Sequence, residues 1–206
     1  MKSENMAIVI LAAGIGKRMR SKLAKVLHPL CGRPMLSYVV DLARSVSPER
    51  IVVVVGRQKS KVEKTFRGHT IEFTHQKEQL GTGHAVHAAR NHLEDFEGDL
   101  LILSGDVPLL RPETIRNLAS YHKAEKSGAT ILTALLDDPR GYGRVLRRDG
   151  EVVAIVEERD ATEEVTRIRE INTGIYLFRS RPLWSALAEI QPANAQGEYY
   201  LTDAIE

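Results

Sequence analysis

One stretch near the amino terminus decides the fold: the apolar run Ala7-Ile8-Val9-Ile10, followed by Leu11 to His28, which reads L-A-A-G-I-G-K-R-M-R-S-K-L-A-K-V-L-H. The apolar run predicts a strand that is buried on both faces, as the strands of parallel sheets are. Gly14 and Gly16 follow it directly, where a chain without Cβ atoms can turn tightly and present backbone N–H groups to an anion. The stretch therefore indicates a buried strand that leads into an anion-binding loop.

The loop after this strand is strongly basic and contains no acidic residue; its cations are Lys17, Arg18, Arg20, Lys22 and Lys25. Several cations on one turn repel each other unless an anion or solvent lies between them, which favours a polyphosphate ligand. The pattern is neither G-x-x-x-x-G-K-[ST] nor G-x-G-x-x-G, so the usual nucleotide fingerprints are absent. A solvated basic loop remains the alternative.

The overall composition excludes a strongly charged binding protein. The 206 residues contain 29 Lys+Arg and 27 Asp+Glu, a formal charge of +2, so no global charge favours nucleic acid or membranes. The first apolar run is too short for a membrane span and has no leader cleavage site. Cys31 is the one cysteine and cannot form an internal disulfide, which agrees with a reducing compartment. These observations predict a cytoplasmic globular protein.

Short apolar runs alternate with helical patterns along the first 126 residues. Strands are predicted over Ala7–Ala13, Arg50–Val55, Thr70–His75 and Leu100–Leu103, and helices over Pro34–Val46, Gly81–His92 and Pro112–Lys126. Strands that are apolar throughout and are each followed by a helix imply right-handed crossovers and helices on both faces of the sheet. The fold class predicted is α/β, with a doubly wound, mostly parallel, Rossmann-like sheet.

The pattern changes after Asp137. Asp149-Gly150 lies between the segments Arg144–Arg148 and Glu151–Val156, which predicts a β-hairpin inserted into the sheet. Ile168–Phe178 predicts a further strand, and Glu198–Glu206 resembles the first turns of a helix. No linker or repeat divides the chain, so residues 1–206 are expected to form one domain, incomplete at its carboxyl end.

In an open parallel sheet, ligands bind at the carboxyl ends of the strands. Ser104-Gly105-Asp106 follows the strand Leu100–Leu103 at that edge, so Asp106 is a candidate ligand for Mg²⁺, which one carboxylate often holds together with substrate phosphate oxygens. The alternative role for Asp106 is that of a turn former. The loop Gln76–Gly83 follows another strand and offers amide groups suited to the edge of a nucleobase, with an ordinary strand-to-helix loop as its alternative.

Eight motifs occur in an order and spacing that resemble one enzyme family: L-A-A-G-I-G-K-R-M, A-K-V-L-H, E-Q-L-G-T-G-H-A, S-G-D-V-P-L, D-D-P-R-G-Y-G-R, I-V-E-E-R-D-A-T, E-I-N-T-G-I-Y and N-A-Q-G-E-Y-Y-L-T-D. Together they resemble the uridyltransferase domain of the bacterial bifunctional N-acetylglucosamine-1-phosphate uridyltransferase and glucosamine-1-phosphate acetyltransferase. The resemblance covers nearly the whole chain. The first motif is shared by sugar nucleotidyltransferases generally, whereas the later ones are specific to this family.

The resemblance implies a set of site residues. Leu11, Ala12, Ala13 and Gly14 match the backbone stretch that holds the nucleotide, and Arg18 and Lys25 match catalytic cations on the triphosphate. The residues that match the uracil-reading loop are Gln76, Gln79, Gly81 and Thr82. Asp106 matches the Mg²⁺ ligand, and Ser104 and Gly105 match positions beside it near the nucleotide. The residues that match the site for the N-acetylglucosamine moiety are Gly143, Glu157 and Asn172.

The reaction implied by the resemblance is attack of N-acetylglucosamine 1-phosphate on the α-phosphorus of UTP, which yields UDP-N-acetylglucosamine and pyrophosphate for cell-envelope synthesis. Mg²⁺ is the implied cofactor, and no nucleic acid or membrane partner is expected. In the family a further domain, a β-helix of hexapeptide repeats, carries the acetyltransferase and forms a homotrimer. This chain shows no such repeats, which leaves a monomer as the expectation for it.

The sequence departs from the family pattern at three points. Lys17 stands where the family commonly has Thr, and Ala24 stands where it commonly has Pro. The third departure is a second Mg²⁺ ligand, an asparagine that in the family lies beyond the position of Glu206. The chain is therefore expected to be a fragment, and binding of UTP without turnover is one expected behaviour.

Two alternatives remain open from the sequence. Another nucleotidyltransferase, such as a cytidylyltransferase or a molybdenum-cofactor guanylyltransferase, would share the glycine and lysine motif but would not require E-Q-L-G-T-G or E-I-N-T-G-I-Y. A catalytically silent module that binds nucleotide sugars would keep the fold and bind ligand without releasing pyrophosphate.

Overall fold

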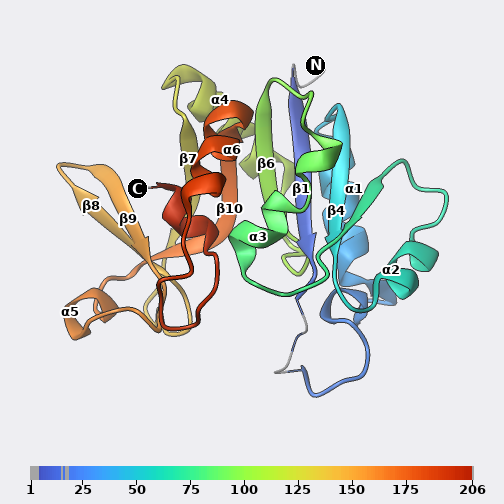
Figure 1. The fold of residues 1–206 in the computed structure, drawn as a ribbon, viewed down its shortest axis with the longest axis horizontal. Coiled ribbons are helices and arrows are strands. Elements are labelled where there is room, and N and C mark those ends of the chain that lie inside the picture. Colours follow the sequence, from blue (N-terminus) through green and yellow to red (C-terminus); the bar gives the residue numbers. More distant parts are fainter. Residues whose placement is uncertain (1–4, 15, 17–18, 206) are drawn as a thin grey trace.

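The computed structural model describes residues 5–14, 16 and 19–205. An eight-stranded sheet runs through the molecule, with helices on both of its faces (Figure 1). Its strands are β1 (Met6–Ala12), β4 (Arg50–Val55), β5 (Glu72–His75), β6 (Asp99–Ser104), β7 (Ala129–Leu135), β8 (Arg144–Arg148), β9 (Glu151–Val156) and β10 (Glu170–Arg179). A separate two-stranded ribbon consists of β2 (Pro29–Leu30) and β3 (Arg33–Pro34).

The sheet has a parallel part and an antiparallel part. The order β5-β4-β1-β6 is parallel throughout, because each of these strands pairs in parallel with its neighbour. Beyond β6 the order continues β10-β8-β9, with β7 also paired to β10, and all of these pairings are antiparallel. The α/β fold class predicted from the sequence is confirmed, and its sheet is mixed around a mostly parallel core.

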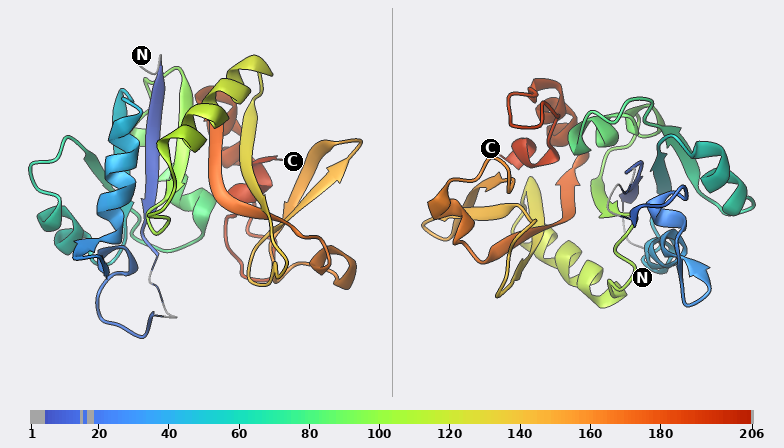
Figure 2. Two further views of the ribbon diagram at one scale, coloured as in Figure 1. Left: turned by 180° about the vertical axis from the view of Figure 1, so that it is seen from behind. Right: turned by 90° about the horizontal axis from the view of Figure 1, so that it is seen from below.

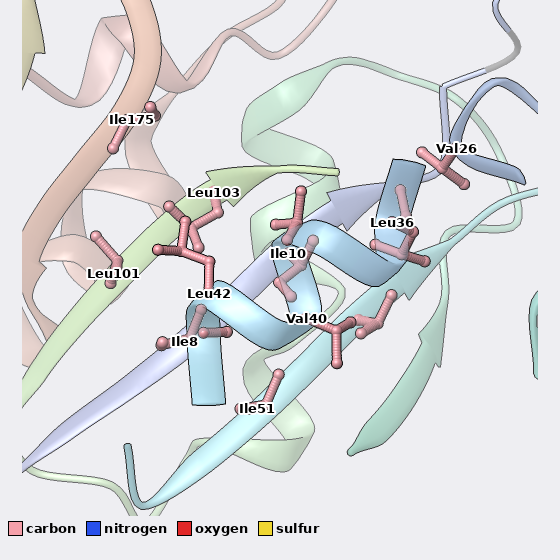
Figure 3. Close-up of a cluster of buried hydrophobic side chains, with 14 of the residues drawn as sticks. Ile8, Ile10, Val26, Leu36, Val40, Leu42, Ile51, Leu101, Leu103 and Ile175 are labelled. Carbon is pink, nitrogen blue, oxygen red and sulfur yellow. The ribbon is translucent and has the colours of Figure 1, made fainter. Parts of the chain in front are cut away.

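Alternation along the strands divides the core into two layers. Ile8 and Ile10 of β1 face one side, where they pack with Leu36 and Val40 of α1 (Met35–Ser45), as Figure 3 shows. The same layer receives α2 (Lys59–Thr65) and α4 (Pro112–Ala124). Successive strand side chains point to opposite faces, so Ala7 and Val9 lie in the other layer. There they pack under α3 (Thr82–His87), α6 (Ser180–Glu189) and the 3₁₀ helix η4 (Leu201–Ile205). Figure 2 shows the two layers from behind and from below.

The hairpin predicted at Asp149-Gly150 is present between β8 and β9. Both turn residues have positive φ, 53° and 88°, as a type I′ turn requires. The hairpin projects from the sheet beside the short helix α5 (Glu163–Thr166) (Figure 1). The hairpin therefore extends the antiparallel part of the sheet beyond β10.

Two predicted helices are shorter than their sequence patterns. The helix expected over Gly81–His92 is regular only from Thr82 to His87, and turns and a second 3₁₀ helix, η3 (Arg90–His92), follow it. The segment expected to begin a helix at Glu198 is irregular until η4 begins at Leu201. In both segments tertiary hydrogen bonds replace helical ones: Gly83 N donates to Tyr199 O and Tyr199 N donates to Leu80 O. A third 3₁₀ helix, η2 (Lys25–Leu27), follows the basic loop.

Candidate active site

The strand β1 ends in a loop that is held against its neighbours by backbone contacts. Leu11 O accepts a hydrogen bond from Gly105 N at 2.9 Å, which joins the loop after β1 to the loop after β6. On the other side, a Cβ at Gly56, which follows β4, would lie 2.5 Å from Ala13 O, closer than any real Cβ contact. Only glycine fits there, so Gly56 is a site-shaping residue that the sequence analysis missed.

Lys25 and Asp106 meet across this edge of the sheet. Lys25 lies in η2, Asp106 follows β6, and the lysine Nζ forms an ion pair with the aspartate Oδ2. Both side chains are about a third exposed, so incoming anions and cations can reach them. Of the predicted cations, Arg18 lies outside the described residues, as does Lys17, and nothing is placed for them.

The predicted base-reading loop, Gln76 to Gly83, is held by hydrogen bonds between its own residues. The Gln76 side chain is buried; its Nε2 lies 3.0 Å from Gly81 O, to which it donates, and 3.1 Å from His84 Nδ1. Gln79 Nε2 donates to Gln76 O at 3.1 Å. The loop is therefore preorganised by its own amide groups, and the Gln76 amide is partly occupied by the chain itself.

A segment near the carboxyl end closes over the same loop. Gly81 has φ +113°, and a Cβ there would lie 2.4 Å from Tyr199 O, so the reason for glycine is the approach of this segment. Leu201 N also donates to Thr82 Oγ1 at 2.9 Å. We call residues 194–201 the strap.

These elements enclose a pocket of about 580 Å³. Ten of the residues predicted from the sequence line it: Leu11, Ala13, Gly14, Lys25, Gln76, Gln79, Gly81, Thr82, Ser104 and Asp106. Gly16, Val26, Ala85, Gln196 and Glu198 complete the lining. Two of the predicted residues, Ala12 and Gly105, lie next to lining residues in the chain. Gln196 and Glu198 of the strap were not predicted individually, although they belong to the motif N-A-Q-G-E-Y-Y-L-T-D.

The predicted sugar-binding residues form a second group beside the pocket. Asn172 N donates to Gly143 O at 2.9 Å, and a Cβ at Gly143 would lie 3.3 Å from Glu157 Oε1. This group comes within reach of the first pocket at β10, where a Cβ at Gly174 would lie 3.4 Å from Ser104 Oγ. The structure thus brings together Gly143 and Asn172, which are 29 positions apart in the sequence, and places Ser104 beside them.

The environment of Glu157 favours its protonated form. Burial raises the pKa of its carboxyl group, and the negative charges of Asp160, Asp203 and Glu198 raise it further. Desolvation and like charges both disfavour an ionised carboxylate. Glu157 therefore has an unusual proton affinity within the predicted sugar-binding group.

The donor set of the pocket fits a divalent cation that is shared with a ligand. Among the described residues, no group of three His, Cys, Asp or Glu could hold a metal by itself. The pocket nevertheless contains the carboxylates of Asp106 and Glu198. Mg²⁺ is commonly bound by one or two carboxylates together with phosphate oxygens and water, so this chemistry suits Mg²⁺ bound with a nucleotide.

Comparison with known proteins defines the class of protein to which this fold and pocket belong. The model of the MobA-like NTP transferase domain family matches residues 8–203. The chain therefore belongs to this family of nucleotidyltransferase domains. In the part of the chain that the structure describes, no helix has the length and apolar character needed to cross a membrane.

Within this class the chain is most informatively compared with the proteins named bifunctional protein GlmU. The protein from Brevibacillus brevis is 52% identical over 198 residues, 96% of this chain and 43% of the relative. That from Lactobacillus delbrueckii subsp. bulgaricus is 50% identical over 200 residues, 97% of this chain and 43% of the relative. The family resemblance drawn from the sequence motifs is thereby confirmed, and the chain spans less than half the length of these curated relatives.

Solved structures show the same fold at low sequence identity. A UDP-glucose pyrophosphorylase complexed with UDP-glucose superposes with a TM-score of 0.76 at 19% identity, covering 96% of this chain and 84% of that chain. A putative glucose-1-phosphate thymidylyltransferase from Bacillus anthracis in complex with a sucrose gives a TM-score of 0.77 at 24% identity, covering 97% and 80%. These similarities establish the arrangement of the sheet and its helices.

Proposed function

We propose that the chain transfers a uridylyl group from UTP to N-acetylglucosamine 1-phosphate, which forms UDP-N-acetylglucosamine and pyrophosphate. One observation carries the proposal: a single pocket brings the loop after β1, the Lys25–Asp106 ion pair and the Gln76–Gly83 loop together at the carboxyl ends of parallel strands. This is the edge at which open α/β sheets bind nucleotides. The homology to GlmU proteins supports the assignment.

The chemistry proposed needs positioning and charge rather than a protein nucleophile. A phosphate oxygen of the sugar phosphate attacks the α-phosphorus of UTP in line, the bond to the β-phosphate oxygen breaks, and pyrophosphate leaves with the electron pair. Lys25 neutralises negative charge that develops on the phosphates, because preorganised cations stabilise such transition states. The loop after β1 contributes backbone N–H groups near the phosphates.

Asp106 would hold Mg²⁺ together with phosphate oxygens of the nucleotide. When bound, the ion supplies charge neutralisation and orients the phosphates. The ion pair between Lys25 and Asp106 holds both side chains at the edge of the pocket, where the ligand would bind. Polyphosphate binding would then draw Lys25 from Asp106 to the phosphate oxygens.

The loop Gln76–Gly83 is assigned to the nucleobase, and the group Gly143, Glu157 and Asn172 is assigned to the sugar. Gln79 and Thr82 line the pocket next to the predicted base position. The sugar group lies beside Ser104, which lines the same pocket. This arrangement would place the two phosphates that react over Asp106, between the base and the sugar.

The direct test measures pyrophosphate release by the 206-residue chain with UTP, N-acetylglucosamine 1-phosphate and Mg²⁺, in parallel with a UTP-binding titration. Release that depends on the sugar phosphate supports the proposal. CTP and GTP in place of UTP distinguish other nucleotidyltransferases, because faster release with either would reassign the base. Binding of UTP or UDP-N-acetylglucosamine without release indicates a binding module, and no binding of either contradicts the proposal.

A further inference from the structure

Asn172, one of the predicted sugar-binding residues, lies at an irregularity of β10. Its pairing with β7 shifts register between Asn172 and Ile175, so Thr173 and Gly174 have no opposite residue in the ladder. Gly174 has φ +75°, and Thr173 Oγ1 donates to Leu132 O at 2.5 Å. Bulges of this kind redirect side chains and are common next to active sites. The irregularity therefore sets the direction of the Asn172 side chain.

The orientation of the Asn172 amide follows from its two neighbours. Gly174 N lies 2.9 Å from one end of the amide, and a backbone N–H can only donate, so that end must be the oxygen Oδ1. The other end is the nitrogen Nδ2, which donates to Tyr176 Oη at 2.6 Å. The flip of the amide is thus determined by hydrogen bonding within β10. Tyr176 takes one of the two N–H groups on Nδ2, and among the described residues no hydrogen bond is formed by the other.

Tyr176 is well suited to hold this amide in place. Its side chain is 3% exposed, and its ring stacks on Phe178 with 5.6 Å between the centroids. Burial raises the pKa of the Tyr176 hydroxyl, which keeps the phenol neutral at physiological pH. Phenylalanine would fill the same volume and keep the stack, so packing does not require the hydroxyl. The hydroxyl is therefore available for a specific role.

We propose that Tyr176 is a positioning residue whose hydroxyl fixes the Asn172 amide so that its second N–H binds an acceptor oxygen of the sugar substituent. This inference rests on the proposed function. The fixed amide offers a donor, and the nearby Glu157 offers a carboxyl oxygen that accepts a hydrogen bond in either protonation state. A donor beside an acceptor matches the C=O and N–H of an acetamido group, which makes Tyr176 a determinant of selectivity between N-acetylglucosamine 1-phosphate and glucose 1-phosphate.

The test compares Tyr176→Phe with the wild-type chain. We expect the KM for N-acetylglucosamine 1-phosphate to rise about tenfold, the value of one oriented hydrogen bond. The KM for UTP should stay within error of wild type, and preference over glucose 1-phosphate should fall. Tyr38→Phe is the matched control, because Tyr38 Oη donates to Leu30 O at 2.7 Å far from the predicted sugar group, and it should change neither KM.

Three further variants separate positioning from a structural role. Asn172→Ala should raise the KM for the sugar phosphate, and adding Tyr176→Phe to it should have no further effect, because the hydroxyl then has no amide to orient. Asn172→Asp keeps an acceptor but removes the donor and should behave like Asn172→Ala. If Tyr176→Phe fails to fold, the effect of Asn172→Asp on selectivity still decides whether a donor is read there.

Three outcomes would overturn the inference. An unchanged KM and selectivity in Tyr176→Phe, with the wild-type chain active, would remove Tyr176 while leaving the proposed function intact. Additive effects in the double variant would show that the hydroxyl acts elsewhere. If the wild-type chain binds UTP but neither binds nor uses a hexose 1-phosphate, the proposed function fails, and the positioning role fails with it.

Discussion

The parallel and antiparallel parts of the sheet carry their predicted site residues in different ways. In the parallel part these residues follow the strands: Gly14 follows β1, Gln76 follows β5 and Asp106 follows β6. In the antiparallel part they lie within or immediately beside strands, as Asn172 does in β10 and Glu157 at the end of β9. Parallel strands gather their ends at one edge, whereas antiparallel strands present side chains according to register.

The two parts also stabilise their site residues differently. Lys25 and Asp106 form a partly exposed ion pair that a ligand can exchange. Beside the sugar group, Arg144 is 1% exposed; its Nη1 lies 2.7 Å from Glu158 Oε2 and also donates to Tyr142 O. Arg144 and Glu158 directly follow Gly143 and Glu157 in the sequence. The comparison suggests an exchangeable phosphate end and a rigid sugar end, and the predictions below test this difference.

The largest effect is expected for the phosphate end. Lys25→Ala should lower kcat/KM for pyrophosphate release by two orders of magnitude or more, about 3 kcal/mol of transition-state stabilisation, while leaving thermal stability nearly unchanged. Steady-state kinetics and thermal unfolding measure the two quantities. Lys59→Ala is the matched control, because Lys59 forms an exposed ion pair with Glu63 away from the pocket. Wild-type turnover in Lys25→Ala would remove this lysine from the mechanism.

A smaller effect, on stability, is expected for the sugar end. Arg144→Met should reduce the free energy of unfolding by about 2–3 kcal/mol, because it leaves the half-buried Glu158 without its partner. Arg167→Met, directly after α5, is the control: Arg167 pairs with Glu163, and both side chains are more than 70% exposed, so its loss should cost about 1 kcal/mol or less. Urea unfolding gives both values. Equal losses would show that the sugar end is no more rigid than the exposed surface at α5.

The contact between the strap and the Gln76–Gly83 loop can be weakened at Gly81. Gly81→Ala combines φ +113° with a clash against Tyr199 O and should reduce stability by about 2 kcal/mol and raise the KM for UTP. Gly68→Ala is the control, because Gly68 has φ +82° but no atom within 4 Å of the added Cβ. It should lose only about 1 kcal/mol, from backbone strain. Equal losses of stability in the two variants would show that Tyr199 of the strap does not restrict the residue at position 81.

The smallest effect concerns the pH dependence of Glu157. Because its folded pKa is raised, Glu157 contributes fully to stability below its ordinary pKa, and this contribution is lost as pH rises through the folded pKa. Glu157→Gln, which cannot ionise, should therefore gain stability relative to wild type as pH increases across that range. Thermal midpoints measured from acidic to neutral pH provide the comparison. A constant difference between the two proteins would contradict the raised pKa.

Much of the parallel half was predictable because its signals are local. The apolar run of β1 and the glycines that follow it lie next to each other in the sequence, so strand and loop could be inferred without knowing their neighbours. The Asp149-Gly150 turn was also predictable from the sequence, because a type I′ turn depends on its two central residues. The strands β7 and the ends of β10 were harder to place, because strand boundaries depend on pairing between distant segments.

The causes of several predicted positions were not predictable. Gly81 was anticipated as a site residue, but its contact with Tyr199 joins segments more than 100 positions apart. The helix over Gly81–His92 was overestimated because its apolar spacing is helical, whereas Tyr199 and Leu201 bind the beginning of the segment and turns end it. Gly56 belongs to none of the sequence motifs, and the requirement for glycine there follows only from the close approach of Ala13 O.

The sequence by itself determined the alternating strands and helices, the basic loop with its following lysine, the carboxylate after β6 and the family to which these motifs belong. Each of these is a local pattern whose meaning comes from residue chemistry and spacing. Only the tertiary structure decided that Lys25 faces Asp106, that the strap covers the Gln76–Gly83 loop and that Tyr176 orients Asn172. Those contacts depend on strand register and on the packing of distant segments, which no local pattern encodes.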